Sequence, residues 1–243
     1  MEDQNKASGI KVLGWILGGA LVLSTALASA VIYQARAGQD TLTVTGSTKK
    51  PVVSDQIKWG MQITRNATAG TLAQAGTLLQ KDSVLVKDFL VKNGATTEQI
   101  TIAPPMTMEV WQQDGNAEKK YSITQQIIVT SSEVDKMSEL AKNTQPLLAQ
   151  GVLFSTSYFN YNYTKLADMR VSMLADAIAD AKARASEIAK AGGKKVGTLK
   201  SASSGVVQVL AVGSTDVSDG GSYNTAEINK EVMVTVKAVF GVR

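Results

Sequence analysis

Two aspartates in one predicted helix are the first candidates for acid–base chemistry. Asp176 and Asp180 are four residues apart, so both carboxylates lie on the same helix face. Paired carboxylates in different environments serve as acid and base in several enzyme classes. Arg184 follows Asp180 by four residues, a spacing that forms ion pairs on exposed helices. We therefore expect a solvated helix face here and not an active site.

Two glycine-containing segments are similar to ligand-binding loops. Residues Asp216–Gly221 contain two aspartates and two glycines, as calcium loops do, but a bidentate glutamate at the required spacing is missing. We expect a flexible hairpin tip there. Residues Gly192–Lys195 combine glycine with lysine, as phosphate loops do, but they follow a predicted helix and do not open one. This segment is predicted to be a helix stop with a basic turn.

The 243-residue chain contains no cysteine and no histidine. This composition excludes disulfides, Cys/His zinc sites, thiol nucleophiles and imidazole bases. Carboxylates, lysines and hydroxyls remain, so a Ser–Lys hydrolase stays open as an alternative, although no serine has a recognisable sequence context. The net charge is +4 with both signs interspersed, which is weak support for nucleic-acid binding. We expect no enzyme activity, no catalytic residue, no cofactor, no metal and no nucleic-acid partner.

An aromatic cluster lies on one predicted extended segment. It consists of Tyr158, Phe159, Tyr161 and Tyr163. Base stacking is one use of such a cluster, but basic residues are not interleaved with it. A core layer or a subunit interface fits better. We take these four residues as a candidate oligomer interface.

The N-terminal region carries a long apolar run, Val12–Tyr33, without a charged residue. Its length as a helix matches a hydrocarbon core of about 30 Å. A cleaved signal peptide is the alternative, since Ala28–Ala30 and Ala35–Ala37 resemble cleavage sites, but the run exceeds a usual signal core. We expect a retained anchor, with Gly14 and Gly18 as a candidate helix contact, although glycine is common in spanning helices. The predicted organisation is a cytoplasmic segment 1–11, an anchor 12–33, a linker 34–40 and an exported domain 41–243.

The exported part alternates paired strands with helices. The predicted order is β-β-α-β-β-α-β-α-β-β-β, which favours an α+β fold of antiparallel sheets covered by helices. A strand at Leu42–Gly46 is expected to end at Lys49–Pro51 and to form a hairpin with a strand at Ile57–Ile63. Helices are expected up to about Lys92, from a capping box at Ser132 and Asp135 to about Thr144, and over Lys165–Ala191. A division into two halves, near 115–120 or 151, is left open.

Several stretches resemble the SIMPL-domain family, whose bacterial members are YggE-like periplasmic or membrane-anchored proteins. The stretches are Leu42–Gly46 with the later Asp55, Ile100–Pro104, Tyr121–Val129, and the Ala- and Lys-rich Ala177–Gly197. The chain departs from the family pattern at Ser54, where a proline usually precedes the aspartate, and at Gly46, which is single where a pair is common. The likeness covers about residues 40–243.

The resemblance implies an α+β domain outside the cytoplasm, no defined catalytic residues, and self-assembly into ring-like or hollow homo-oligomers with links to envelope and oxidative stress. We therefore expect a single-pass protein of the bacterial inner membrane with its main domain on the periplasmic side. Its role would be that of a non-enzymatic scaffold. The alternative is a periplasmic module that binds a small ligand or peptide, with residues 213–225 as a lid.

Overall fold

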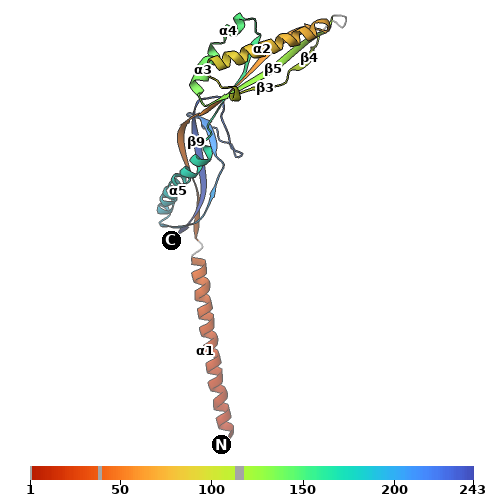
Figure 1. Cartoon of the computed structure of the whole chain (residues 1–243). Coiled ribbons are helices and arrows are strands. Elements are labelled where there is room, and N and C mark those ends of the chain that lie inside the picture. The colour runs from red at the N-terminus through yellow and green to blue at the C-terminus, as the bar shows by residue number, and fades with distance from the viewer. Residues whose placement is uncertain (1, 38–39, 113–117) are drawn as a thin grey trace. The chain divides into compact units, whose positions relative to one another are not determined.

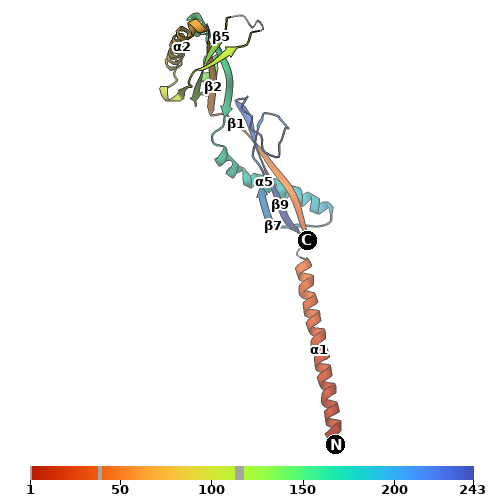
Figure 2. The same cartoon turned by 90° about the vertical axis from the view of Figure 1, so that its right-hand side faces the viewer.

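The computed structural model describes residues 2–37, 40–112 and 118–243. Figures 1 and 2 show two views of the chain. Its longer elements are α1 (Glu2–Ala37), β1 (Thr41–Val53), β2 (Gln56–Thr68), α2 (Leu72–Lys92), β3 (Ile100–Ile102), β4 (Met106–Val110), β5 (Lys120–Ser131), α3 (Val134–Lys142), α4 (Gln145–Ala149), β6 (Phe154–Asn162), α5 (Leu166–Ala191), β7 (Val196–Ser204), β8 (Gln208–Ala211) and β9 (Asn229–Val242). Antiparallel sheets with helices make this an α+β fold, as predicted.

The chain forms two compact units, and each unit is assembled from separate stretches. Unit 1 contains residues 1–48, 174–205 and 235–243, and unit 2 contains residues 49–173 and 206–234. The chain therefore changes unit four times, within β1, α5 and β9 and just after β7. Neither 115–120 nor 151, the two divisions left open from the sequence, coincides with a boundary.

Helix α1 contains the predicted anchor. Residues Gly14–Tyr33 form a 20-residue stretch with a mean hydropathy of 2.0, long and apolar enough to cross a membrane. The side chains of this stretch are exposed, as those of a lipid-facing helix would be. A signal sequence would have the same character. A Cβ atom added at Gly14 or Gly18 would meet no atom within 4 Å, so both glycines lie on an open surface.

Unit 2 is built on a five-stranded sheet in the order β3-β5-β2-β6, with β4 also paired to β5. Strand β2 pairs antiparallel with β5, Trp59 opposite Val129, and with β6, Trp59 opposite Phe159. Helix α2 lies against one face of this sheet in both views (Figures 1 and 2). The alternating apolar residues of β2 and β5 point to this face and form a buried core with α2, whose largest members include Trp59, Met61, Leu79, Leu90 and Ile127.

Unit 1 packs α5 against strands β1, β9 and β7, which follow that order in their sheet. The helix contributes alanines to the contact, and Ala177, Ala181 and Ala185 are completely buried. Small side chains let the helix backbone approach the sheet closely. At Gly46 of β1 the approach leaves no room for a Cβ atom, because the backbone of Ala177 and Ala181 occupies that space. The predicted alanine face of this helix is therefore its packing face.

Two predictions about the first strands were wrong. Strand β1 does not end at Lys49–Pro51 but continues through Pro51 to Val53. It lies at the edge of the order β1-β9-β7, where a residue without an N–H is tolerated. Strand β2 is not its hairpin mate, because β2 pairs with β5 and β6 in the other sheet.

The predicted capping box at Ser132 and Asp135 was also wrong. Helix α3 begins at Val134 after Glu133, and the Oγ atom of Ser131 accepts a hydrogen bond from the Glu133 N–H at 3.0 Å. The helix ends at Lys142, before the expected Thr144. A second short helix, α4, then carries Pro146 in its first turn, a position that suits proline because the missing N–H has no partner there in any case.

Candidate functional site

One member of the predicted carboxylate pair, Asp180, takes part in two hydrogen bonds. Its Oδ2 atom accepts hydrogen bonds from the backbone N–H of Ser47 and from Nε of Arg184, both at 2.8 Å. The Ser47 N–H, followed by the Arg184 side chain, holds the pKa of Asp180 below its ordinary value. The carboxylate is thus kept ionised and joins α5 to β1. The i,i+4 partner expected from the sequence is confirmed, and the Ser47 contact has no sequence signal because it joins residues far apart in the chain.

The segment Gly192–Lys195 is the helix stop predicted from the sequence. Gly193 adopts φ +69°, in the left-handed region that favours glycine. The N–H of Lys194 donates to the carbonyl oxygen of Ala189 at 2.8 Å, which closes the last turn of α5. The lysines of this turn reappear below as part of a basic surface.

Residues 213–225 form a loop whose C-terminal end is held by hydrogen bonds. The Tyr223 hydroxyl accepts a hydrogen bond from the N–H of Tyr163 at 2.8 Å, and the N–H of Asn224 donates to the carbonyl oxygen of Val209 at 2.8 Å. Gln208 adds a side-chain hydrogen bond to the carbonyl oxygen of Ser218. The calcium-like segment 216–221 lies within this loop, and over the described ranges no group of three or more histidine, cysteine, aspartate or glutamate side chains is placed to hold a metal ion.

Lys230 is a buried amine that no sequence pattern had singled out. Its side chain is fully buried, and its Nζ atom donates to the carbonyl oxygen of Asn224 at 2.6 Å. The Tyr223 ring lies 6.0 Å from the same nitrogen. Burial lowers the pKa of Lys230, and the charge of Glu227 opposes that effect. The amine therefore fastens the end of the 213–225 loop through a backbone carbonyl.

The aromatic cluster is divided between the core and the surface of unit 2. Phe159 stacks between Trp59 and Tyr161, with ring centroids 6.0 and 6.1 Å away. The Tyr161 hydroxyl is 3.2 Å from the Ser138 hydroxyl, and the Tyr158 ring covers Gly60. All four predicted residues, Tyr163 included, are half-buried. Their assignment to an oligomer interface stays a prediction.

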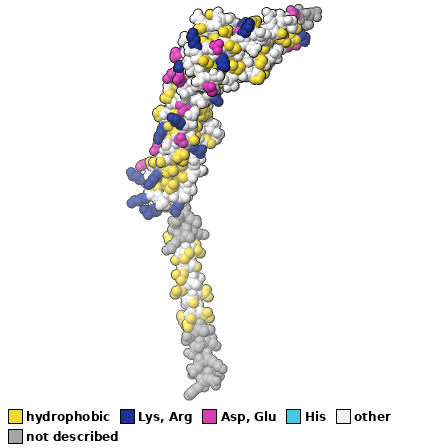
Figure 3. Space-filling model, viewed as in Figure 1, with side chains coloured by type: hydrophobic (Ala, Val, Ile, Leu, Met, Phe, Trp, Pro, Cys, Tyr) yellow, Lys and Arg dark blue, Asp and Glu magenta, His cyan; other side chains and the backbone are white. Residues whose placement is uncertain are grey.

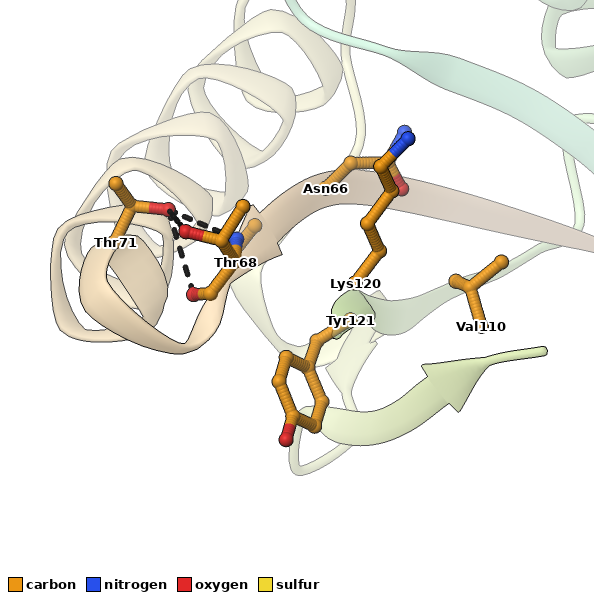
Figure 4. A pocket seen from close by; sticks show the side chains of 7 residues that line it. Asn66, Thr68, Thr71, Val110, Lys120 and Tyr121 are labelled. Carbon is orange, nitrogen blue, oxygen red and sulfur yellow. Dashed lines mark hydrogen bonds between the residues drawn. The ribbon is translucent and has the colours of Figure 1, made fainter. Parts of the chain in front are cut away.

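A depression of about 470 Å³ lies at the end of β2, beside the first residues of β5 and the last residue of β4. Figure 4 shows its lining, which includes Asn66, Thr68, Val110, Lys120 and Tyr121. The Lys120 side chain extends toward Asn66 while the Tyr121 ring points the other way (Figure 4). The loop 213–225, predicted as a lid, contributes no residue to this depression.

Several exposed apolar side chains of unit 2 lie together on and beside β4. Met106, Met108 and Val110 are paired with Thr124, Ser122 and Lys120 of β5, so they share the sheet face that α2 does not cover. Met106 is 62% exposed and Met108 60%, and the adjoining Trp111 is 83% exposed. Hydrophobic side chains are visible over this margin in Figure 3. The sequence predicted only that the chain resumes an extended course here.

Together these features define an α+β protein with an N-terminal apolar helix. The model of the SIMPL family, described as proteins of unknown function (DUF541), matches residues 42–240. The chain therefore belongs to the SIMPL family, which confirms the resemblance seen in its motifs.

Curated proteins provide no match to the chain. Among solved structures, a proposed aminohydrolase from methicillin-resistant Staphylococcus aureus shows a distant likeness, with 9% identity and a TM-score of 0.22. The likeness covers 58% of this chain and 38% of that structure. A similarity at this level carries no argument about fold or activity.

Proposed function

We propose that this SIMPL protein is a non-enzymatic envelope protein that α1 holds in the bacterial inner membrane. Its main domain would lie on the periplasmic side and assemble into a ring-like homo-oligomer, as a scaffold in envelope or oxidative stress. One observation carries the assembly proposal: β4 presents exposed apolar side chains on a sheet margin that no described strand covers. Soluble monomers rarely leave such a margin open, because an unpaired strand edge is a template for pairing with another chain.

The β4 margin has the properties of a pairing edge. Its one strand partner among the described residues is β5, so the backbone groups on its other side face outward. Pro104 and Pro105 interrupt the edge between β3 and β4, so the methionines lie on a separate stretch of edge strand. Methionine adapts its shape to a partner surface and is common where proteins associate.

The opposite margin of the same sheet is β6, which carries the predicted aromatic interface. The loop of the same chain covers its second half, since the Tyr161 N–H donates to the carbonyl oxygen of Thr225 at 2.8 Å. The first half remains exposed from Ser155 to Ser157, next to Tyr158. Tyr158 is therefore better placed for an intermolecular contact than Tyr161 or Tyr163.

Two different open margins favour a head-to-tail contact. If β4 of one subunit meets the first half of β6 of the next, the contact is heterologous, and such contacts close into a ring when the rotation per subunit allows. A ring multiplies the number of anchors on one assembly, and this raises membrane attachment without a stronger individual helix.

The test is the mass of the detergent-solubilised full chain by light scattering over a wide concentration range. We expect a closed oligomer for the native sequence and a monomer for Met108→Lys, since a lysine on a strand edge opposes pairing. Val84→Lys is the matched control, because Val84 is 53% exposed on α2 and outside the margin. A native chain that is monomeric at every concentration would overturn the assembly proposal.

A further variant separates the domain from the anchor. Replacing Gly14 and Gly18 by leucine would break an oligomer that depends on close packing of spanning helices. We expect the oligomer to survive this change. Loss of the oligomer here, with Met108→Lys still oligomeric, would assign assembly to α1 and refute the role of β4.

Membrane attachment has its own test. Cells expressing the chain should retain it at full mass in the membrane fraction after alkaline carbonate washing, and protease added to spheroplasts should digest the domain. Recovery of a shortened soluble chain would show that the segment is a cleaved signal. Complete protection from protease would place the domain on the cytoplasmic side.

A further inference from the structure

A group of lysines gathers at the end of α5 and in the turn that follows it. Lys182, Lys190, Lys194 and Lys195 line a shallow depression of about 540 Å³, together with Ser186, Gly193 and Val196. All four lysines are exposed, and no carboxylate is part of the lining. Figure 3 shows dark blue side chains gathered at this end of the helix. We call these four residues the lysine patch.

One member of the lysine patch is neutralised and holds the patch in place. The Nζ atom of Lys194 lies 2.5 Å from Oδ2 of Asp40, and this contact lowers the pKa of Asp40. Lys182, Lys190 and Lys195 form no ion pair with a carboxylate in the described part of the chain. Three of the four ammonium groups are therefore free of an ion pair among the described residues.

The dipole of α5 does not account for the whole patch. A helix favours cations within its last turn, and this explains Lys190. Lys182 lies more than two turns before the end of the helix, and Lys195 lies beyond it. The three lysines are spread over the last turns of α5 and the turn that follows it, which suits an extended surface of negative charge.

The length of the connecting chain limits how far the lysine patch can lie from the apolar stretch of α1. Asp40, the partner of Lys194, follows Tyr33 by seven residues, and the first four of these remain helical up to Ala37. Four helical residues span about 6 Å and three extended ones at most about 11 Å. The contact between Lys194 and Asp40 is thus tethered within roughly 17 Å of the end of the hydrocarbon-spanning stretch. Lipid headgroups extend about 5–7 Å beyond the hydrocarbon core, and the Debye length adds about 8 Å.

From this placement we propose that the lysine patch binds the anionic headgroups of the leaflet from which α1 emerges. The ligand is the phosphate of acidic phospholipids at the membrane surface, recognised by the ammonium groups of Lys182, Lys190 and Lys195. The proposal rests on the membrane anchoring proposed above. Juxtamembrane lysines each change binding to an anionic surface by about fivefold, so three change the ratio of docked to undocked domain by about 100-fold.

The experiment uses the full chain reconstituted in lipid vesicles. Because the sequence has no cysteine, Ser186→Cys gives one fluorophore position inside the depression. A donor on this cysteine and an acceptor on a lipid headgroup, chosen as a pair that transfers energy only near contact, then report docking in vesicles of phosphatidylcholine alone and in vesicles with added phosphatidylglycerol. We expect strong energy transfer only in the vesicles that contain phosphatidylglycerol. We expect high salt to abolish this transfer, because salt screens the attraction between the lysines and the lipid phosphates.

Charge variants test the assignment to the lysine patch. Replacing Lys182, Lys190 and Lys195 by glutamine should remove the transfer, with Lys194 kept because it pairs with Asp40. The matched control replaces three exposed lysines of unit 2, Lys58, Lys81 and Lys92, by glutamine and should keep it.

Either of two outcomes overturns the proposal: equal transfer in both vesicle types, or full transfer in the patch variant. Flotation with phosphatidylcholine vesicles reports the anchor independently. A chain that fails to float refutes anchoring, whereas a chain that floats without charge-dependent transfer refutes the patch.

Discussion

The close approach of β1 to α5 gives a sharp prediction about Gly46. A Cβ atom at this position would lie 2.7 Å from Cβ of Ala181, and the carbonyl oxygen of Ala177 and the N–H nitrogen of Ala181 would be closer still. Ordinary contacts between carbon atoms begin at about 3.5 Å, so Gly46→Ala forces the strand and helix apart by at least about 0.8 Å. Two of these obstructing atoms belong to the helix backbone, which no side-chain rotation can move.

The expected cost follows from the packing that this separation disrupts. A gap of about 0.5–1 Å removes a quarter to a half of the dispersion energy of each contact across the interface. Overpacking of a core typically costs about 1–3 kcal/mol, and we expect the upper end, about 3 kcal/mol, because Ala177, Ala181 and Ala185 are fully buried in this contact. The assay is urea unfolding of the full chain in detergent, followed by far-UV circular dichroism.

The same substitution at Gly76 provides the control. Gly76 is exposed inside α2, and an added Cβ atom would meet nothing within 4 Å. Gly76→Ala should therefore raise stability by about 1 kcal/mol through helix propensity. Gly46→Ala with native or increased stability would refute the close approach of β1 to α5.

Three other changes have defined outcomes. Arg65 donates to both carboxylate oxygens of the buried Asp82, with Nη2 at 2.7 Å from Oδ1. Arg65→Met should therefore lower the free energy of unfolding by about 3–5 kcal/mol, because it leaves the buried charge of Asp82 unpaired. A loss below about 1 kcal/mol in urea unfolding would contradict this interpretation. The buried Ser54 hydroxyl has no hydrogen-bond partner among the described residues, so Ser54→Ala should raise stability by about 1 kcal/mol in the same assay, and a loss would show that the hydroxyl is satisfied. Burial lowers the pKa of Lys230, so the unfolded chain binds this proton more tightly and stability should rise as pH increases from the lowered pKa toward the ordinary value. Lys230→Met should remove that alkaline rise in a series of unfolding curves, and an unchanged rise would assign it to other groups.

Long elements with a regular apolar pattern were predictable from the sequence. Helix α5 was expected over Lys165–Ala191 and spans Leu166–Ala191, because its alanine face and the following glycines are local signals. Strand β9 was recognised from the alternation of Val232, Val234 and Val236. The apolar pattern of each element indicates which of its faces is buried, but it does not indicate which other element packs against that face.

Strand pairing was not predictable in the same way. Consecutive strands β1 and β2 were expected to form a hairpin, but the chain passes from one sheet to the other after Val53. The Ser54 N–H donates to the carbonyl oxygen of Ile228 at 2.9 Å, a partner 174 residues away. Nothing in the local sequence around Ser54 identifies that partner.

The candidate surfaces, too, were predictable where they depend on local sequence and not where they depend on tertiary structure. The lysine-containing turn Gly192–Lys195 was visible as a basic segment, but its concave arrangement with Lys182 depends on the helix that brings them together. The apolar margin at β4 was missed, since Met106 and Met108 read equally well as a buried strand face. Exposure is a property of the assembled sheet, and alternation alone does not reveal it.

The hydrogen bonds around Asp40 have a mechanical consequence. The Val242 N–H donates to the carbonyl oxygen of Asp40 at 2.9 Å, so the first described residue after α1 is joined to the last strand of the domain. Tension applied through α1 would reach this bond and the Lys194 contact before any other part of the sheet. A pull on the membrane helix would therefore open unit 1 from its entry point, with Asp40 as the first residue released.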